Sequence, residues 1–272
     1  MDDRTLATAV RAVVAIEAET LQGLAQRLGA QDAALAAACR LIHGAEGRLV
    51  ATGVGKAGLI ARKVAATFAS TGTPALFLHP AEARHGDLGM VQPHDVVLAF
   101  SNSGSSEELI ALLPSLAHIG ARVIAITGDP AAPLARHAAV ALDLGRIAEA
   151  CPLGLAPSAS TTAMLALGDA LALAVQRLRA FTPEQYARFH PGGALGRRLM
   201  TCAEAMRRGE RAPAVGPDTH VIDCLRAITA ARAGAVVLTD PTGVVLGIFT
   251  DGDLRRCLTR SEDPAAVLIA PV

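Results

Sequence analysis

Short apolar runs alternate with helical stretches from residue 49 onward, and this alternation constrains the fold more than any other feature. A strand that is covered on both faces reads as a continuous apolar run, and turns that contain glycine or proline separate such runs from helices. We therefore expect an α/β fold in which helices cover both faces of a parallel sheet. The predicted strands are residues 49–52, 75–78, 95–100, 122–127 and 139–143.

The segment before the first predicted strand is rich in Ala and Leu and contains no Pro between residues 3 and 43. Its apolar residues recur at helical spacing, which predicts two helices with a break near Gly29. We expect these helices to cover the sheet or to pair with another subunit. The residues that carry the spacing are Leu6, Val10, Val13, Val14, Leu21, Leu24 and Leu28.

The composition argues against several classes of protein. The 272 residues carry 25 basic and 25 acidic side chains, and no Lys/Arg cluster is present that would attract nucleic acid. The 5 cysteines are scattered without a CxxC pair, which is typical of reduced thiols in a cytoplasm. The N-terminus lacks a signal-peptide pattern, and the most apolar helical stretch, Ala163–Val175, contains Asp169 and is too short to span a bilayer. We expect a soluble, cytoplasmic protein that binds neither nucleic acid nor membrane.

The third predicted strand leads into a serine-rich segment, residues 101–106, which we call the serine loop. A helix follows at residues 109–113 and is predicted to close at Pro114. Backbone N–H groups and the positive end of the dipole at such a helix start attract anions. The simpler alternative is that the serines only cap the helix, but the loop holds more of them than capping needs. The pattern favours a phosphate cradle whose hydroxyl donors are Ser101, Ser103 and Ser106.

A glycine-rich turn follows the first predicted strand, where Gly53, Gly55 and Gly58 match the G-x-G-x-x-G pattern of dinucleotide-binding folds. That pattern needs an acidic residue at the end of the second strand to hold the ribose, and here the strand ends at His79. Lys56 also occupies a position in the turn that usually carries a small or apolar residue. A nicotinamide dehydrogenase is therefore disfavoured.

Several polar residues follow predicted strands and should lie at one edge of the sheet, because ligands of parallel sheets bind at the carboxyl ends of the strands. They are Lys56, the serine loop and Glu149. Glu108 lies one turn beyond the loop, where a carboxylate would repel a phosphate unless it does chemistry on the far end of the ligand. The simpler alternatives are a solvated loop carboxylate for Glu149 and an ordinary surface histidine for His190.

A group of three potential metal ligands, His79, Glu82 and His85, lies within seven residues. It could form a metal site, but a fourth strong ligand and the spacing of H-E-x-x-H zinc sites are missing from the sequence around it. Polar side chains that line a sugar pocket are the better interpretation.

The composition shifts after Leu199. Residues 201–217 are rich in Arg, Gly and Pro and predict a linker. A small α-β-β-α unit follows, so we expect two domains, 1–200 and 201–272. The predicted elements of the second are a helix at 221–232, strands at 235–239 and 244–249, and a helix from Asp253.

Several of these segments, in order, resemble the D-arabinose-5-phosphate isomerases, which join a sugar isomerase (SIS) domain to CBS repeats. The resemblance covers about residues 5–260. It implies a three-layer αβα, flavodoxin-like SIS domain with a C-terminal partial CBS unit of α+β type. The matching segments are 53–58, 71–74, 79–90, 101–104, 149–157 and 190–196, and 247–255 is similar to the end of a CBS repeat.

The resemblance implies reversible interconversion of D-ribulose 5-phosphate and D-arabinose 5-phosphate, which feeds the synthesis of 3-deoxy-D-manno-octulosonic acid for lipopolysaccharide or capsule. It also implies a homotetramer that needs no cofactor. His79 matches a position linked with zinc, whose role in the family looks inhibitory rather than catalytic. The family's functional positions fall on Lys56, Glu108, Glu149 and His190, with His85, Gly72 and Thr73 at the substrate.

Two departures from the family pattern matter. Family members often carry Glu where this chain has Ser105, and Glu107 here keeps the local charge two residues further on. The family normally has two CBS repeats, and this sequence holds one. A cleft for an adenosine nucleotide would therefore need a repeat from another subunit.

The chemistry implied by the resemblance needs a base for a carbon-bound proton and a donor that stabilises the enediolate. Our hypothesis makes Glu149 the leading base and Glu108 its rival, while Lys56 orients hydroxyls and stabilises negative charge. His190 would act in ring opening or in proton return between oxygens, from a neighbouring subunit. The main alternative is a non-catalytic sugar-phosphate sensor, but such regulators usually carry a DNA-binding head, and the N-terminal helices lack a basic recognition helix.

Overall fold

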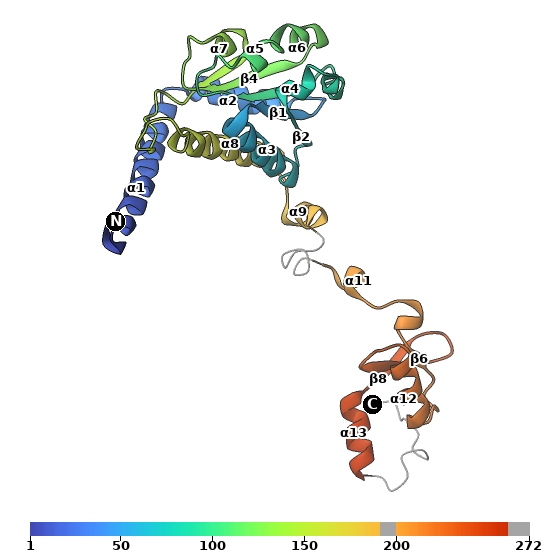
Figure 1. The fold of residues 1–272 in the computed structure, drawn as a ribbon. Helices are drawn as coiled ribbons and strands as arrows, with labels where there is room; N and C mark the ends of the chain where they lie inside the picture. The colour runs from blue at the N-terminus through green and yellow to red at the C-terminus, as the bar shows by residue number, and fades with distance from the viewer. Residues whose placement is uncertain (191–199, 261–272) are drawn as a thin grey trace. The chain divides into compact units, whose positions relative to one another are not determined.

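The computed structural model describes residues 1–190 and 200–260. The chain divides into two compact units, Met1–Leu199 and Met200–Val272, which we call the sheet unit and the tail unit. Figure 1 shows the elements of each. The glycine-rich part of the motif that follows His190, residues 191–196, lies outside the described residues.

The sheet unit is built on a parallel sheet of five strands in the order β2-β1-β3-β4-β5. This 2-1-3-4-5 order is the flavodoxin-like arrangement, so the prediction of an αβα fold with a parallel sheet is confirmed. All residues of β1 and β3 are buried, as strands covered on both faces must be. The strands are β1 (Leu49–Gly53), β2 (Ala75–Leu78), β3 (Val96–Phe100), β4 (Arg122–Thr127) and β5 (Val140–Asp143).

Helices cover both faces of this sheet (Figure 1). One face packs on α2 (Asp32–His43), α3 (Gly55–Ser70) and α8 (Ala159–Leu178). The other face packs on α4 (Pro80–Ala83), α5 (Glu107–Ile110), α6 (Leu113–Ile119) and α7 (Pro133–His137), and a 3-10 helix, η1 (Asp87–Met90), follows α4. The chain changes face after β2, so the strand order reverses between β1 and β3, where doubly wound sheets bind their ligands.

The segment after the serine loop forms two short helices. α5 ends at Ile110, and α6 begins at Leu113 with Pro114 in its first turn. Proline is favoured there because the N–H that it lacks would have no partner within the helix. The prediction that Pro114 closes the helix is therefore wrong, since Pro114 begins the next one.

The N-terminal segment forms α1 (Asp3–Leu28) and α2, and the predicted break near Gly29 is confirmed. The Asp2 side chain caps α1 by accepting a hydrogen bond from the Thr5 N–H at 2.8 Å. The first half of α1 projects from the sheet unit (Figure 1), with Val10 66% and Val14 63% exposed. The C-terminal part of α1, with Leu24 buried, packs against the rest of the unit.

α8 is the one helix in the described part of the chain that is long and apolar enough to cross a membrane. It has 20 residues, so the prediction that this stretch is too short for a bilayer is wrong by length. Half of its most apolar window is buried, and it packs against α1, α2 and α3. These are the surroundings of a core helix of a folded domain.

The tail unit has a three-stranded sheet in the order β6-β7-β8 around a small core that includes Cys224, Val236 and Phe249. The predicted helix–strand–strand–helix order is confirmed. The predicted linker is in part structured, because it contains α11, the 3-10 helix η2 and β6. The elements are α11 (Cys202–Ala205), η2 (Gly209–Arg211), β6 (Ala214–Val215), α12 (Val221–Ala230), β7 (Ala235–Thr239), β8 (Val245–Thr250) and α13 (Asp251–Arg260), while α9 (Pro183–Phe189) closes the described part of the sheet unit.

Two helical glycines provide a matched test of the contact between α3 and α8. A Cβ on Gly168 would lie 2.5 Å from Val64 Cγ2, whereas nothing lies within 4 Å of one on Gly23 in α1. Because alanine is the better helix former, Gly23→Ala should raise the free energy of unfolding by up to about 1 kcal/mol. Gly168→Ala should lower it by about 1–3 kcal/mol, because overpacking outweighs that gain. Urea denaturation measures both, and equal stabilisation by the two changes would contradict the close contact.

Candidate active site

α3 and α8 lie side by side and run in the same direction (Figure 1). Val64 of α3 faces Gly168 of α8, and further along Thr73 accepts a hydrogen bond from Arg179 Nε at 3.0 Å. The residue numbers of the contacts rise together along both helices. Both helices therefore begin at the same end of the unit, which is the carboxyl edge of the sheet.

Lys56 is the second residue of α3 and is exposed at this edge. The turn from β1 into α3 needs glycine at two points, since Gly55 has a φ of 57° and a Cβ on Gly58 would lie 2.5 Å from the Gly53 oxygen. Lys56 and Ser160 each lie eight residues before the contact between the two helices. Because both helices rise about 1.5 Å per residue, Lys56 is level with the first turn of α8.

Glu149 binds to that first turn of α8. Its Oε2 accepts hydrogen bonds from the backbone N–H groups of Ser158 at 2.8 Å and Ser160 at 3.3 Å, so the half-buried carboxylate caps the helix. Burial opposes its ionisation, but the hydrogen bonds from Ser158 and Ser160 outweigh burial and lower the pKa of Glu149. Glu149 is thus an oriented, ionised carboxylate at the start of α8, next to the start of α3 where Lys56 lies. It is not a solvated loop residue.

The serine loop is held together by its own hydroxyls. Ser101 is buried, and its Oγ lies 2.9 Å from Ser106 Oγ and accepts a hydrogen bond from the Gly104 N–H at 3.0 Å. Ser106 is the N-cap residue of α5, yet its side chain makes no capping hydrogen bond. Capping alone therefore does not explain the serines, and the loop has a preorganised form.

The loops that follow β3, β4 and β5 pack directly on one another through Gly128. The N–H of Gly128 donates to the backbone oxygen of Asn102 at 2.9 Å. A Cβ on Gly128 would lie 2.9 Å from both the side-chain Oδ1 of Asn102 and the backbone oxygen of Gly145. The serine loop and the chain that leads to Glu149 are thus separated by the width of one glycine.

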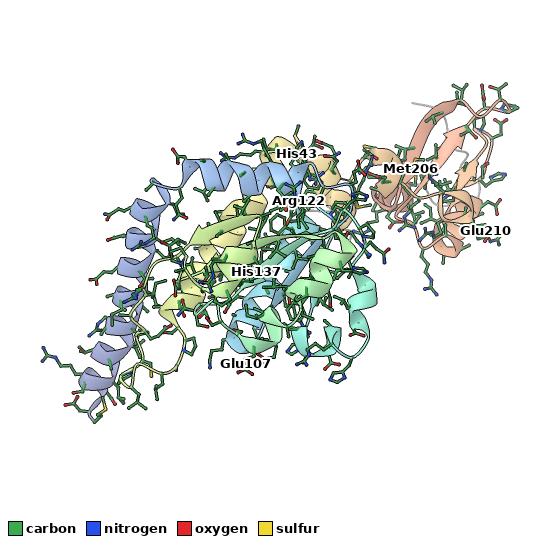
Figure 2. The ribbon with its side chains drawn as sticks, turned by 90° about the horizontal axis from the view of Figure 1, so that it is seen from above. His43, Glu107, Arg122, His137, Met206 and Glu210 are labelled. Atoms are coloured by element: carbon green, nitrogen blue, oxygen red, sulfur yellow. The ribbon has the colours of Figure 1, made fainter. Side chains whose placement is uncertain are left out.

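Three further candidates lie near the carboxyl edge. Glu108 is half-buried in the first turn of α5, directly behind the serine loop. Glu107, which carries the charge displaced from position 105, is exposed where α5 begins (Figure 2). His85 is exposed in the loop after α4, on the side where β2 ends.

The zinc position implied by the resemblance has a structural role in this fold. His79 Nδ1 accepts a hydrogen bond from the Ala81 N–H at 3.2 Å and caps α4. In the neutral ring the proton then sits on Nε2, so a metal could bind only at the expense of this arrangement. Among the residues that the structure describes, no group of three or more His, Cys, Asp and Glu side chains could hold a metal ion. The surroundings of His79 within one chain do not fit zinc.

Gly72, Thr73 and His190 lie at the opposite, amino edge of the sheet. Thr73 comes before β2 rather than after it, and a Cβ on Gly72 would clash with the Phe181 ring. Phe181 stacks on Phe189 with ring centroids 5.8 Å apart, and His190 follows directly. Within one chain, the structure brings together Lys56, the serine loop and Glu149. Gly72, Thr73 and His190 lie apart from this group.

The backbone N–H groups of Ser158 and Ser160 are contributors that the sequence interpretation misses. A run of small hydroxyl residues before an apolar helix is an N-cap signal, and Ser158 is indeed the N-cap residue of α8. The signal does not say which carboxylate the helix start will bind, because that depends on the path of the loop from β5.

The fold and this site define a SIS domain protein, and residues 41–174 match the SIS domain family. The chain is 48% identical to the arabinose 5-phosphate isomerases KdsD of Pseudomonas aeruginosa and Escherichia coli (strain K12). The matched region covers 95% and 96% of this chain, respectively, and 79% of each relative. The chain belongs to the arabinose 5-phosphate isomerase KdsD family. A solved Escherichia coli CFT073 protein in complex with arabinose 5-phosphate is 40% identical with a TM-score of 0.66, covering 70% of this chain and 100% of that one.

The helix cap formed by Glu149 predicts a pH-dependent contribution to stability. We expect Glu149→Gln to unfold at a lower temperature than the wild type at neutral pH, by an amount worth roughly 0.5 kcal/mol after solvent screening. Because the pKa is lowered on folding, the difference should be fully present above the ordinary value of 4.5 and fade as the pH falls through the folded-state pKa. Thermal denaturation from neutral to acidic pH measures it, and a difference that grows in acid would contradict the assignment.

Proposed function

We propose that this chain is an aldose–ketose isomerase that interconverts D-ribulose 5-phosphate and D-arabinose 5-phosphate through an enediolate. The observation that carries the proposal is the position of Lys56 and the Glu149 carboxylate at the neighbouring starts of α3 and α8, beside the serine loop. The relatives named arabinose 5-phosphate isomerase, and the solved relative that holds arabinose 5-phosphate, support a pentose phosphate as the substrate.

The isomerisation moves two protons and no other atoms. Glu149 takes a proton from C1 of the ketose, the electrons of that C–H bond form the C1–C2 double bond, and the carbonyl pair moves onto O2. A proton then returns to C2 while the proton on O1 is transferred to O2, which leaves the aldehyde at C1. A positioned carboxylate contributes about 10²–10⁴-fold as general base.

The remaining residues have distinct roles in this scheme. The ammonium group of Lys56 stabilises the negative charge on the enediolate, which is usually a large contribution to catalysis. His190 transfers the proton between the two oxygens or opens the sugar ring, and Glu108 remains the rival base.

We propose that the serine loop holds the phosphate of the substrate. The hydroxyls of Ser101, Ser103 and Ser106 and the backbone N–H groups at the start of α5 are the donors. The hydrogen bonds that already order the loop lower the cost of fixing it around an anion. His85 would contact the sugar end of the substrate.

The site needs groups from two copies of the chain. His190, Gly72 and Thr73 lie at the amino edge of one sheet and Lys56 at the carboxyl edge, so one chain alone does not combine them. This supports a homo-oligomer, for which we propose a tetramer, and the exposed apolar residues Val10 and Val14 of α1 suit such an interface.

We further propose that the reaction needs neither a metal nor a redox cofactor, since oxidation at one carbon is matched by reduction at its neighbour. His79 caps α4 in this fold, so no step of the proposed reaction depends on a metal at this residue. The product would feed the synthesis of 3-deoxy-D-manno-octulosonate and lipopolysaccharide or capsule in the cytoplasm, with no nucleic-acid or membrane partner. The tail unit would be a single CBS-type repeat.

Turnover of D-ribulose 5-phosphate in the presence of EDTA tests the proposal, with the product identified by NMR. The wild type should form D-arabinose 5-phosphate, and Glu149→Gln should lower kcat by about 10²–10⁴-fold. Glu210→Gln, at an exposed carboxylate of the tail unit, is the matched control and should keep normal turnover. Thermal stabilisation by the sugar phosphate without turnover would instead indicate a sensor.

Mixing two inactive variants tests the shared site. If His190 acts in the neighbouring copy, mixing Glu149→Gln with His190→Asn and letting the subunits exchange should restore activity, because mixed pairs contain intact sites. Random pairing restores up to about a quarter of the sites. Each variant alone should stay inactive after the same treatment, and a mixture with no more activity than its parts would show that both groups act within one chain.

A further inference from the structure

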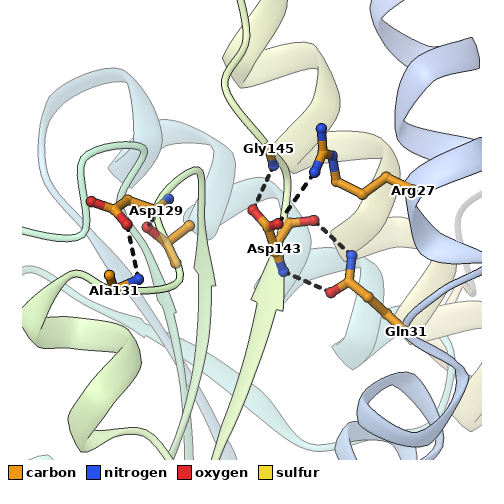
Figure 3. A network of polar contacts seen from close by, with 7 residues as sticks. Arg27, Gln31, Asp129, Ala131, Asp143 and Gly145 are labelled. Carbon is orange, nitrogen blue, oxygen red and sulfur yellow. Dashed lines mark hydrogen bonds and ion pairs between the residues drawn. The ribbon is translucent and has the colours of Figure 1, made fainter.

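Gln31, which lies at the junction of α1 and α2, binds the outer edge of the sheet like a short neighbouring strand. Its Nε2 donates to the Asp143 backbone oxygen at 2.9 Å, and its Oε1 accepts from the Asp143 N–H at 2.9 Å (Figure 3). β5 is the edge strand of the sheet, so these two bonds satisfy backbone groups that would otherwise face water. They also fix the last residue of β5, from which the chain leaves toward Glu149.

Arg27 of α1 fixes the next step of the chain. Its NH1 lies 3.4 Å from Asp143 Oδ2, while Asp143 Oδ1 accepts a hydrogen bond from the Gly145 N–H at 2.7 Å (Figure 3). A Cβ on Gly145 would clash with Arg27 Nε, so the guanidinium covers this glycine without a gap. The ion pair is partly exposed and adds little stability by itself, but it sets the direction in which the chain leaves the sheet.

α1 also contacts the far end of the same loop. Glu17 Oε2 accepts a hydrogen bond from Thr162 Oγ1 at 3.0 Å, in the first turn of α8. That turn contains Ser158 and Ser160, whose N–H groups hold the Glu149 carboxylate. The segment between β5 and α8, residues 144–158, which we call the Glu149 loop, is therefore tied to one helix at both ends.

We propose that Glu17, Arg27 and Gln31, here named the α1 clamp, are positioning residues for Glu149. The inference rests on the proposed function, in which Glu149 is the base. The clamp lies outside the site and acts through the loop. Glu17 and Arg27 lie on α1, a continuous helix of 26 residues that fixes the distance between the two attachment points, and Gln31 lies just before α2. Gly128 carries the same constraint to the serine loop, because it packs between Gly145 and Asn102.

A purely structural role for the clamp would predict a different result, and a double-mutant cycle separates the two. Gln31→Ala should lower kcat by about tenfold or more with KM within about twofold, because a small misplacement of a reacting group is costly. In the Glu149→Gln background the same change should cost less than about twofold, since the group that it positions is gone. Gln22→Ala, at an exposed glutamine of α1, is the matched control and should change neither constant.

Thr162→Val tests the other end of the loop with a change of nearly equal size, and it should show the same dependence on Glu149. A loss of kcat that is equal in the wild-type and Glu149→Gln backgrounds for both variants would overturn the proposal.

Hydrogen exchange provides a readout that does not depend on activity. In Gln31→Ala, backbone exchange should rise in residues 144–158 and at the start of α8, while β1 and β3 keep their protection. A rise in exchange throughout the sheet unit, or no rise in the Glu149 loop, would overturn the proposal. If the wild type fails to convert the pentose phosphate, the proposed function fails, and the exchange pattern still decides whether α1 holds the loop.

Discussion

The contact between Gly168 and Val64 lets α3 and α8 lie close together and in parallel, and the site depends on this. Parallel helices that begin at one edge bring two positive dipole ends together. That field favours both the Glu149 carboxylate and an anionic substrate. The hydrogen bonds from Ser158 and Ser160 outweigh the effect of burial and lower the pKa of Glu149, which makes it a weaker base. Burial acts in the opposite sense, so a substrate that encloses the carboxylate would raise its basicity at the moment it is needed.

The sequence predicts those features that are fixed by local pattern. Each strand is a short apolar run whose neighbours on both faces are helices, so its position follows from the run itself. The edge on which Lys56 and the serine loop lie follows from topology alone, since both come directly after a strand. Pro114 shows the limit of such patterns, because proline is compatible with the start of a helix as well as with an end.

The features that the sequence does not predict are set by contacts between distant segments. The partner of Glu149 is a helix start nine residues away along the chain, and only the path of the loop decides that they meet. β6 is too short to show a pattern of its own and exists because it pairs with β7. The position of Gly72 and Thr73 could have been predicted from the topology, because residues that precede a strand lie at the amino edge of the sheet.

α1 combines two structural properties. Its first half carries exposed apolar side chains, while its second half contacts Asp143 of the edge strand through Arg27 and the start of α8 through Glu17. A helix of 26 residues is roughly 39 Å long and stiff, so its two halves move together. Pairing of copies through the first half of α1 would therefore act on the same helix that holds the Glu149 loop. Assembly of the copies would in this way affect the position of the Glu149 carboxylate.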